Sequence, residues 1–154
     1  MREVTIVAIG KLKESFWQAA WQEYWPRLNA FYKVSLVELS PEKFSGNTVT
    51  KAKQVEGERI EAYLQKRAGT EIVLLAEQGK EFDSGELANA IFNKTIPLTL
   101  VVAGTAGFSE VILKKYPVHW SLSRLTLPHE LARVVLLEQL YRAGTIATEK
   151  KYHY

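Results

Sequence analysis

Short apolar segments alternate along the chain with longer segments in which apolar residues recur every three or four positions. Such patterns are typical of buried strands and of amphipathic helices, respectively. The short segments predict strands at residues 4–9, 34–39, 71–76, 98–103 and 118–122. The periodic segments predict a helix after each strand, including residues 49–66, one ending near Asn93, one ending near Tyr116 and one at residues 130–147. This order predicts one α/β domain over residues 1–154, with a mostly parallel sheet and helices on both faces.

Local signals support several of these helices. Asp83 followed by Glu86 matches a capping box, and Ser109 can cap the short helix that follows it. Trp17, Trp21 and Leu28 form part of an aromatic and apolar stripe in the first helix, where Pro26 is expected to bend or end the helix. Such a stripe could stack on bases, but aromatic residues at helical spacing usually belong to a core, and we interpret them so.

The helix at residues 130–147 has apolar side chains in nearly every direction, which predicts packing on more than one side. Arg133, Glu138 and Arg142 interrupt it, and burying such charges without partners is costly. They either reach a rim or face a partner subunit or a ligand. Glu138 and Arg142 stand four residues apart in the orientation of an ordinary helical ion pair.

Ligands of parallel α/β sheets bind beyond the carboxyl ends of the strands. Three predicted ends are notable: the end at Leu75, the glycine turn at residues 104–107, and the loop at residues 123–129. The turn is neither a dinucleotide fingerprint nor a P-loop, and taken alone it can be a simple strand-to-helix turn. The loop exposes backbone groups that can bind the edge of an adenine. Alternatively, Leu125 and Leu127 fill the core while His129 caps or packs.

The net charge of +3 permits nucleic acid as a partner without requiring it. The distribution of charge is more informative, because Glu149 is the only acid after Arg142, among lysines and tyrosines. Cations bind phosphate and aromatic rings stack on unpaired bases, so the tail is the best candidate in the chain for a contact with nucleic acid. A frayed, solvated terminus is the alternative.

Other classes of protein find little support in the sequence. There is no cysteine, the three histidines lack metal-ligand spacing, and no serine lies in a nucleophile-elbow context. No apolar run approaches the roughly 20 residues that span a bilayer, and the amino terminus lacks the features of a leader. We expect a cytoplasmic protein with no metal and no membrane partner.

Several segments together resemble a known family. They are the first strand ending in a glycine, the strand end at Leu75, the glycine turn, and the motifs LSRLTLPH at residues 122–129, RVVLLEQLYRA at residues 133–143 and Tyr152-His153 near the end. The chain resembles the SPOUT-class methyltransferases of the ribosomal RNA large subunit methyltransferase H family, which modify N3 of a pseudouridine in helix 69 of large-subunit ribosomal RNA. The resemblance covers essentially the whole chain.

The resemblance implies more than the pattern alone. It implies a trefoil knot at the carboxyl-terminal end of the sheet, a homodimer, S-adenosylmethionine as the cofactor, and large-subunit ribosomal RNA within the assembled ribosome as the partner. It implies a catalytic, RNA-facing group formed by Arg142, Tyr152 and His153, with the tail completing the site across the dimer. The implied cofactor contacts are Leu75, Gly104, Leu122, Ser123, Arg124, Leu125, Thr126 and Leu127.

Three positions depart from the pattern of the family. Ala103 replaces the first of two adjacent glycines, Lys151 precedes Tyr152, and Tyr154 replaces a terminal basic residue. These departures leave two alternatives: a ribosome-binding or RNA-binding protein of the same fold that has lost catalysis, and a SPOUT methyltransferase that acts on another RNA, such as transfer RNA. The short chain, without an appended RNA-binding domain, argues against transfer RNA.

Overall fold

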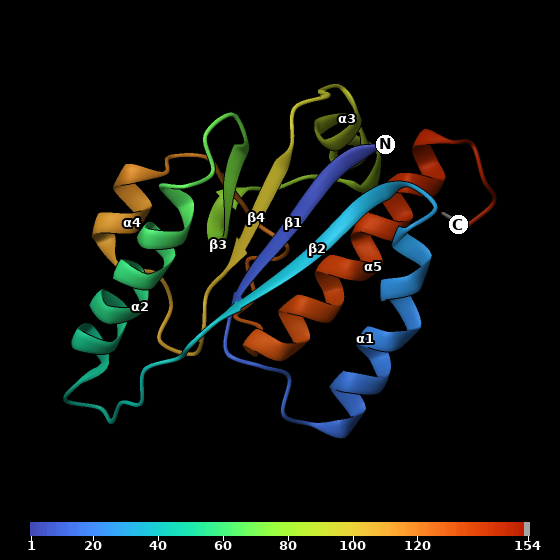
Figure 1. Ribbon diagram of the computed structural model, residues 1–154. Coiled ribbons are helices and arrows are strands. Elements are labelled where there is room, and N and C mark those ends of the chain that lie inside the picture. The colour runs from blue at the N-terminus through green and yellow to red at the C-terminus, as the bar shows by residue number, and fades with distance from the viewer. Residues whose placement is uncertain (153–154) are drawn as a thin grey trace.

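The computed structural model describes residues 1–152 as one parallel α/β sheet flanked by helices (Figure 1). The strands lie in the order β2-β1-β4-β3-β5. They comprise β1 (Arg2–Ile9), β2 (Tyr32–Leu39), β3 (Glu71–Lys80), β4 (Leu98–Val102) and β5 (His119–Trp120). The helices comprise α1 (Ser15–Leu28), α2 (Val49–Leu64), α3 (Ser84–Phe92), α4 (Glu110–Lys115) and α5 (His129–Ala147). The predicted alternation of strands and helices is confirmed.

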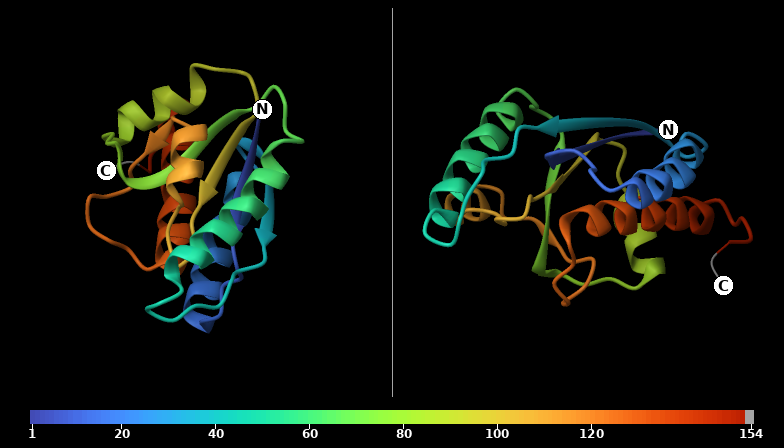
Figure 2. Two further views of the ribbon diagram at one scale, coloured as in Figure 1. Left: turned by 90° about the vertical axis from the view of Figure 1, so that its left-hand side faces the viewer. Right: turned by 90° about the horizontal axis from the view of Figure 1, so that it is seen from below.

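The helices cover both faces of the sheet, as predicted (Figure 2). Alternate side chains of a strand point to opposite faces. Val4 and Ile6 of β1 accordingly pack in the cluster formed with α1, α3 and α5, whereas Val7 and Ile9 pack in the cluster formed with α2 and α4. The predicted trefoil knot stays a prediction.

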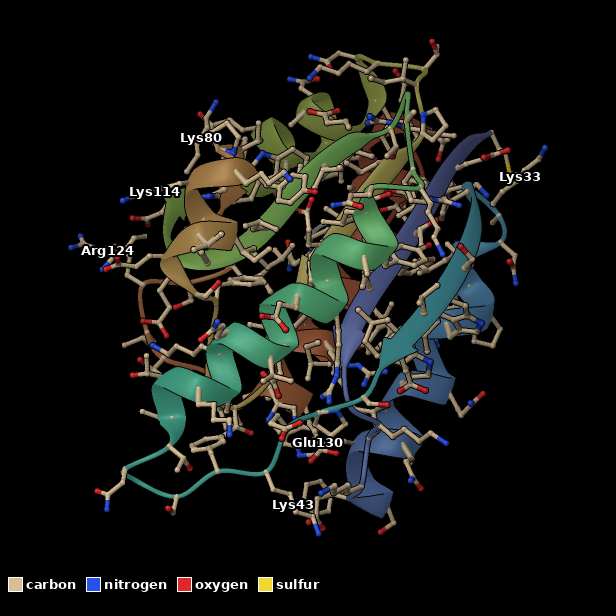
Figure 3. The ribbon with its side chains drawn as sticks, turned by 60° about the vertical axis from the view of Figure 1, so that its left-hand side comes forward. Lys33, Lys43, Lys80, Lys114, Arg124 and Glu130 are labelled. Atoms are coloured by element: carbon tan, nitrogen blue, oxygen red, sulfur yellow. The ribbon has the colours of Figure 1, made fainter. Side chains whose placement is uncertain are left out.

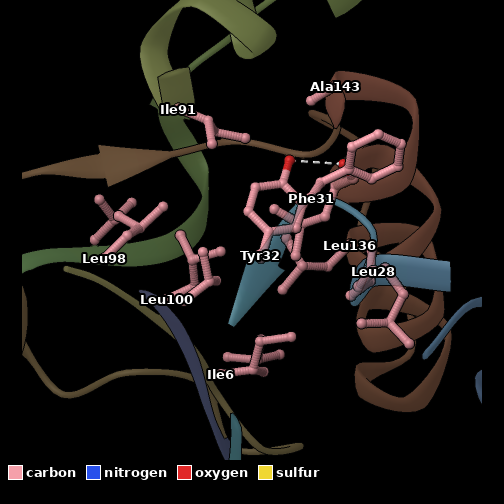
Figure 4. Packing of buried hydrophobic residues seen from close by; sticks show 14 of the residues in the cluster. Ile6, Leu28, Phe31, Tyr32, Ile91, Leu98, Leu100, Leu136 and Ala143 are labelled. Atoms are coloured by element: carbon pink, nitrogen blue, oxygen red, sulfur yellow. Dashed lines mark hydrogen bonds between the residues drawn. The ribbon is translucent and has the colours of Figure 1, made fainter. Parts of the chain in front are cut away.

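The larger cluster contains Trp21 and Leu28 of the predicted stripe, whereas Trp17 is only partly buried and lies outside it. Trp21, Leu28, Phe31 and Tyr32 are buried. The Tyr32 hydroxyl donates to the Leu140 carbonyl at 2.8 Å, which joins the start of β2 to α5 (Figure 4). Burial raises the pKa of Tyr32 well above its ordinary value, so the phenol stays a hydrogen-bond donor.

The predicted helix signals are also found. Asp83 and Glu86 form the capping box, with both hydrogen bonds at 2.8 Å, and the Ser109 side chain accepts from the Ile112 N–H at 3.3 Å. Pro26 lies in the last turn of α1, which ends at Leu28. The side chains of Asp83, Glu86 and Ser109 thus accept from backbone N–H groups that the first turn of a helix leaves free.

Two predicted strand boundaries are wrong. β3 continues past Ala76 to Lys80, and β5 is confined to His119–Trp120. The extension has a long-range cause: Trp120 pairs with Lys80 as well as with Leu75. At this crossing a Cβ on Gly79 would lie 2.6 Å from the carbonyl carbon of His119, so the two backbones meet where only glycine fits.

Arg133 is buried, and its partners belong to the same chain rather than to a rim, a partner subunit or a ligand. Its side chain donates to Glu38 at 2.9 Å and to the Gly10 carbonyl at 3.2 Å. It also lies over the Trp21 ring, at 4.9 Å from the centroid. The residue therefore ties α5 to the ends of β1 and β2 within one chain.

Candidate active site

The register of the sheet brings the three predicted strand ends together. Leu75 of β3 pairs with Val102, the last residue of β4, and also with Trp120 of β5. The glycine turn follows β4 directly, and the loop at residues 123–128 follows β5 after two residues. Leu75 is not the end of β3, which continues to Lys80, but it lies opposite the ends of β4 and β5 and so close to Gly104 and Leu122.

The glycine turn is a tight turn packed against the end of β1. The Gly107 N–H donates to the Gly104 carbonyl at 3.0 Å, and Gly107 has φ of +81°, a conformation that glycine adopts cheaply. A Cβ on Gly104 would lie 2.9 Å from a methyl carbon of Ile9. Thr105 Oγ1 is hydrogen-bonded to His129 Nδ1 at 3.2 Å, which ties the turn to the start of α5.

The loop at residues 123–128 extends into solvent. Leu125 is 73% exposed, so the alternative in which it fills the core is wrong; Leu127 is half-buried. The Ser123 hydroxyl accepts from the Leu125 N–H at 3.0 Å, an arrangement that shapes the loop locally. Arg124 and Thr126 are exposed, with Arg124 3.7 Å from Glu81.

A cavity of about 100 Å³ lies between α5, α3 and the strand residues that precede this loop. Two predicted contacts, Leu75 and Leu122, line it, and so does Ser121, whose buried hydroxyl has no hydrogen-bond partner among residues 1–152. Ligand pockets usually span roughly 300–1,000 Å³, so this cavity suits only the ring of a larger ligand. The other lining residues are Phe82, Leu87, Ile91, Leu100, Trp120, Val135, Leu136, Gln139 and Leu140.

A larger cavity of about 550 Å³ lies between α2 and α4. Lys53, Lys115, Glu58, Glu61 and Glu110 are among the residues that line it, so it carries both signs of charge. None of the predicted cofactor contacts lines it. Volume alone therefore does not identify the site that the sequence predicts.

The predicted catalytic residues Arg142 and Tyr152 lie together near the end of α5. Arg142 donates to Glu138 at 2.6 Å, which confirms the predicted helical ion pair, and its guanidinium lies 5.1 Å from the centroid of the Tyr152 ring. The hydrogen bond with Glu138 raises the pKa of Arg142 further, so it remains a cation. Burial, reinforced by the Glu138 carboxylate, raises the pKa of Tyr152 to about 12, so this phenol is protonated at neutral pH. His153 lies outside the described residues.

One chain does not bring this cluster to the cofactor loop. Arg142 lies 13 residues after His129 along α5, which corresponds to roughly 20 Å at 1.5 Å per residue. The glycine turn and the loop lie at the opposite end of the helix, near His129. The glycine turn and the loop therefore form one group and Arg142 with Tyr152 another, at opposite ends of α5. The cavity beside Leu75 and Leu122 lies between them, against residues 135–140 of the helix.

The start of the tail is ordered against α5, so the frayed-terminus alternative is wrong as far as Tyr152. The Lys150 N–H donates to the Thr145 carbonyl at 2.8 Å and the Glu149 N–H to the Ile146 carbonyl at 3.2 Å, which is a Schellman arrangement. Tyr152 packs edge-on against Tyr141, with centroids 4.6 Å apart. Glu149 occupies the left-handed position of the motif, with φ of +55°.

Replacing Glu149 by glycine is expected to stabilise the protein by about 1 kcal/mol, because glycine adopts this φ without the steric cost of a side chain. Thermal or urea unfolding measures the change. Glu149→Ala is the matched control: it removes the same charge but keeps a Cβ, so it should leave stability nearly unchanged. An equal gain in both variants would assign the effect to charge.

The sequence reading missed two buried polar residues near the site. Ser121 lies in the predicted strand at residues 118–122 and Glu56 in the charged helix predicted at residues 49–66, and both are buried. Gly57 gives a signal for Glu56, because a glycine inside a helix often marks a close contact. A Cβ there would lie 2.9 Å from the Ser109 hydroxyl oxygen.

Two further searches cover the described part of the chain. Among residues 1–152, no group of three or more His, Cys, Asp or Glu side chains is arranged to hold a metal ion. Within the same range, no helix is long and apolar enough to cross a membrane.

The sequence is similar to those of known methyltransferases. The family described as "Predicted SPOUT methyltransferase" matches residues 2–153. The chain is 37% identical, over the full length of both chains, to a protein of Pelotomaculum thermopropionicum called ribosomal RNA large subunit methyltransferase H. It is 41% identical to a protein of the same name from Lactobacillus helveticus, over 97% of this chain and 98% of that one.

A solved structure supports the fold. A "probable methylase family protein" from Haemophilus influenzae Rd KW20 superposes with a TM-score of 0.60, covering 99% of this chain and 71% of that one. Its sequence is 13% identical, so it bears on the fold alone.

Fold and site together define a parallel α/β protein with a candidate ligand site formed by a glycine turn and a loop at the carboxyl ends of its strands. The chain belongs to the SPOUT methyltransferase family. Within it, the chain belongs to the ribosomal RNA large subunit methyltransferase H family.

Proposed function

We propose that this protein is an S-adenosylmethionine-dependent methyltransferase of large-subunit ribosomal RNA. In the finer form of the proposal, the acceptor is N3 of a pseudouridine in helix 69 of the assembled ribosome. The carrying observation is the meeting of Leu75, the Gly104 turn and the loop at residues 122–127 at one edge of the sheet. Family membership and the names of the full-length relatives support it.

The residues present fit this cofactor. The apolar cavity beside Leu122 suits an adenine ring, and the Ser121 hydroxyl offers a buried hydrogen bond that no residue in the described part of the chain uses. The exposed backbone of the loop offers N–H and C=O groups to the ring edge, and the rest of the cofactor lies outside the small cavity. When bound, S-adenosylmethionine supplies the methyl group that the acceptor nitrogen takes up.

The catalytic work of the chain is to bind, orient and neutralise charge. Well-oriented reactants gain on the order of 7–11 kcal/mol from positioning alone. Arg142, held as a cation, would stabilise negative charge that develops on the acceptor base when its N–H proton is lost. Tyr152 would act as a hydrogen-bond donor to the base, since its pKa of about 12 keeps it protonated at neutral pH. His153 would help to orient the base.

The two groups at opposite ends of α5 support a homodimer in which the tail of one subunit completes the cofactor site of the other. The glycine turn and the loop lie roughly 20 Å along the helix from Arg142, which favours a tail supplied by the partner subunit. Such sharing requires a two-fold arrangement in which each subunit gives and receives a tail.

The surface beside the cofactor loop suits an RNA partner. Lys80, Lys114 and Arg124 are exposed and project from the same side of the molecule, away from Lys33 (Figure 3). Exposed cations of this kind bind phosphate groups with little dependence on base sequence. This surface would orient the ribosome while the site selects the nucleotide.

Two measurements test the proposal. Calorimetry of the purified protein should show saturable binding of S-adenosylmethionine; the absence of binding would favour an RNA-binding protein without catalysis. Mass mapping of ribosomal RNA from cells that lack the protein should show an unmethylated pseudouridine in helix 69. If that nucleotide is still methylated and another RNA loses a methyl group, the acceptor is a different RNA.

A further inference from the structure

Glu56, in the middle of α2, places a buried carboxylate directly behind the Gly104 turn. The residue is 3% exposed. One oxygen, Oε2, accepts from the Glu42 N–H at 3.0 Å. The other, Oε1, has no hydrogen-bond partner among residues 1–152 and lies 3.4 Å from the position of a Cβ on Gly104. The free oxygen is therefore directed at the backbone of the turn.

A carboxylate oxygen that is buried without a donor is unfavourable, because it has lost water and gained nothing in return. Gly104 is the turn residue beside Oε1, and the turn carries backbone N–H groups of the kind that a carboxylate oxygen accepts from. The Gly104 carbonyl is engaged by the Gly107 N–H at 3.0 Å, so the turn already has a defined shape. A small movement of its backbone would bring an N–H to Glu56.

The surroundings of Glu56 hold it in place. Arg59, one turn further along α2, donates to the Ser40 carbonyl and to the Glu42 carboxylate, both at 2.9 Å. On the other side, Gly57 is packed so closely against Ser109 and Ile112 that α2 has no room to approach α4. Glu56 is thus a fixed point to which the turn can adjust.

We propose that Glu56 is a positioning residue for the cofactor turn. Its Oε1 accepts a backbone N–H from residues 104–106 and so holds the turn in the shape that receives S-adenosylmethionine. Glu56 acts through the turn, because α2 covers the face of the sheet opposite to the α5 cavity. This inference rests on the proposed function.

Replacing Glu56 by glutamine separates this role from simple packing. Glutamine has nearly the same shape but only one oxygen, so it cannot accept from both the Glu42 N–H and the turn. We expect the Kd and KM for S-adenosylmethionine to rise about 10- to 100-fold, the effect of losing one charge-assisted hydrogen bond, with kcat at saturating cofactor within about two-fold of wild type. Calorimetry and steady-state kinetics measure both.

Glu58→Gln is the matched control, since it makes the same change two residues away at an exposed position of α2. It should leave the affinity and the thermal unfolding temperature unchanged. Wild-type affinity in a folded Glu56→Gln variant would overturn the inference. If the wild-type protein itself fails to bind S-adenosylmethionine, the proposed function fails instead.

Hydrogen exchange of the wild-type protein gives a second test that does not depend on the variant folding. Binding of S-adenosylmethionine should slow exchange of the backbone amides at residues 104–106, because one of them becomes bonded to Glu56. Saturation with the cofactor without such protection would contradict the role of Glu56.

Discussion

Replacing Arg142 by alanine is expected to slow methyl transfer to ribosomal RNA by about 100- to 1,000-fold, the usual cost of removing one charged donor from a developing anion. The fold should survive, because the Arg142–Glu138 pair is partly exposed and pairs of this kind contribute at most about 1 kcal/mol. Single-turnover assays with radiolabelled cofactor and ribosomes measure the rate. Arg142→Lys keeps the charge but loses the planar fork and should recover only part of the activity.

Lys33→Ala is the control for the loss of one positive charge. Lys33 lies on β2, on the side of the molecule opposite to Lys80 and Arg124 (Figure 3), so its removal should change the rate of methyl transfer less than about two-fold. A similar loss of rate in Arg142→Ala and Lys33→Ala would show that Arg142 acts through general attraction to RNA. Undiminished turnover in Arg142→Ala would remove this residue from the mechanism.

Subunit mixing tests whether the tail acts across the dimer. Arg142→Ala damages the tail side, and Leu122→Glu places a charge in the cofactor cavity. If each site combines the loop of one subunit with the tail of the other, a mixed dimer contains one intact site. An equal mixture should then recover about a quarter of wild-type activity, given random pairing in a two-fold dimer. If each site uses one chain only, mixing recovers nothing.

Replacing Arg133 by alanine is expected to reduce the free energy of unfolding by about 2–5 kcal/mol, since it empties the space of a buried side chain and leaves the Gly10 carbonyl without its donor. The guanidinium is 1% exposed and holds Glu38, Gly10 and the Trp21 ring together. Urea denaturation followed by circular dichroism measures the loss. Arg133→Met, which restores bulk without charge, should recover most of this loss, because Glu38 is exposed and water can solvate its carboxylate.

Arg27→Ala is the matched control for stability. Arg27 also pairs with a glutamate on its own helix, Glu23, but both side chains are largely exposed. The expected loss is below about 1 kcal/mol. A loss at Arg133 no larger than the loss at Arg27 would show that the burial of Arg133 makes no special contribution.

Local sequence patterns predicted the elements well and their long-range pairing poorly. The capping box at Asp83 depends on residues three positions apart, so a short window contains all the necessary information. The extension of β3 to Lys80 depends on Trp120, forty residues later, and no local pattern contains that partner. The strand order could not be read from periodicity for the same reason.

In the candidate site, too, some features followed from the sequence pattern and others depended on distant residues. Leu75 pairs with the last residue of β4, so its position beside the glycine turn followed from the predicted parallel topology, although β3 itself continues to Lys80. The burial of Glu56 was not predicted from the many charged residues of α2, although its spacing of four residues from Ala52 and from Ile60 places it on the buried face. The partner of Arg133 was equally hidden, since Glu38 precedes it by 95 residues.

The straight course of α5 also limits how the length of the chain can vary. Arg133 is fixed in the core at one point of this helix, and Arg142 lies two and a half turns further on, facing the tail. Inserting or deleting one residue between them would rotate one arginine by about 100° relative to the other. Members of the family are therefore expected to differ in length in their surface loops, while the spacing between these two arginines stays at nine residues.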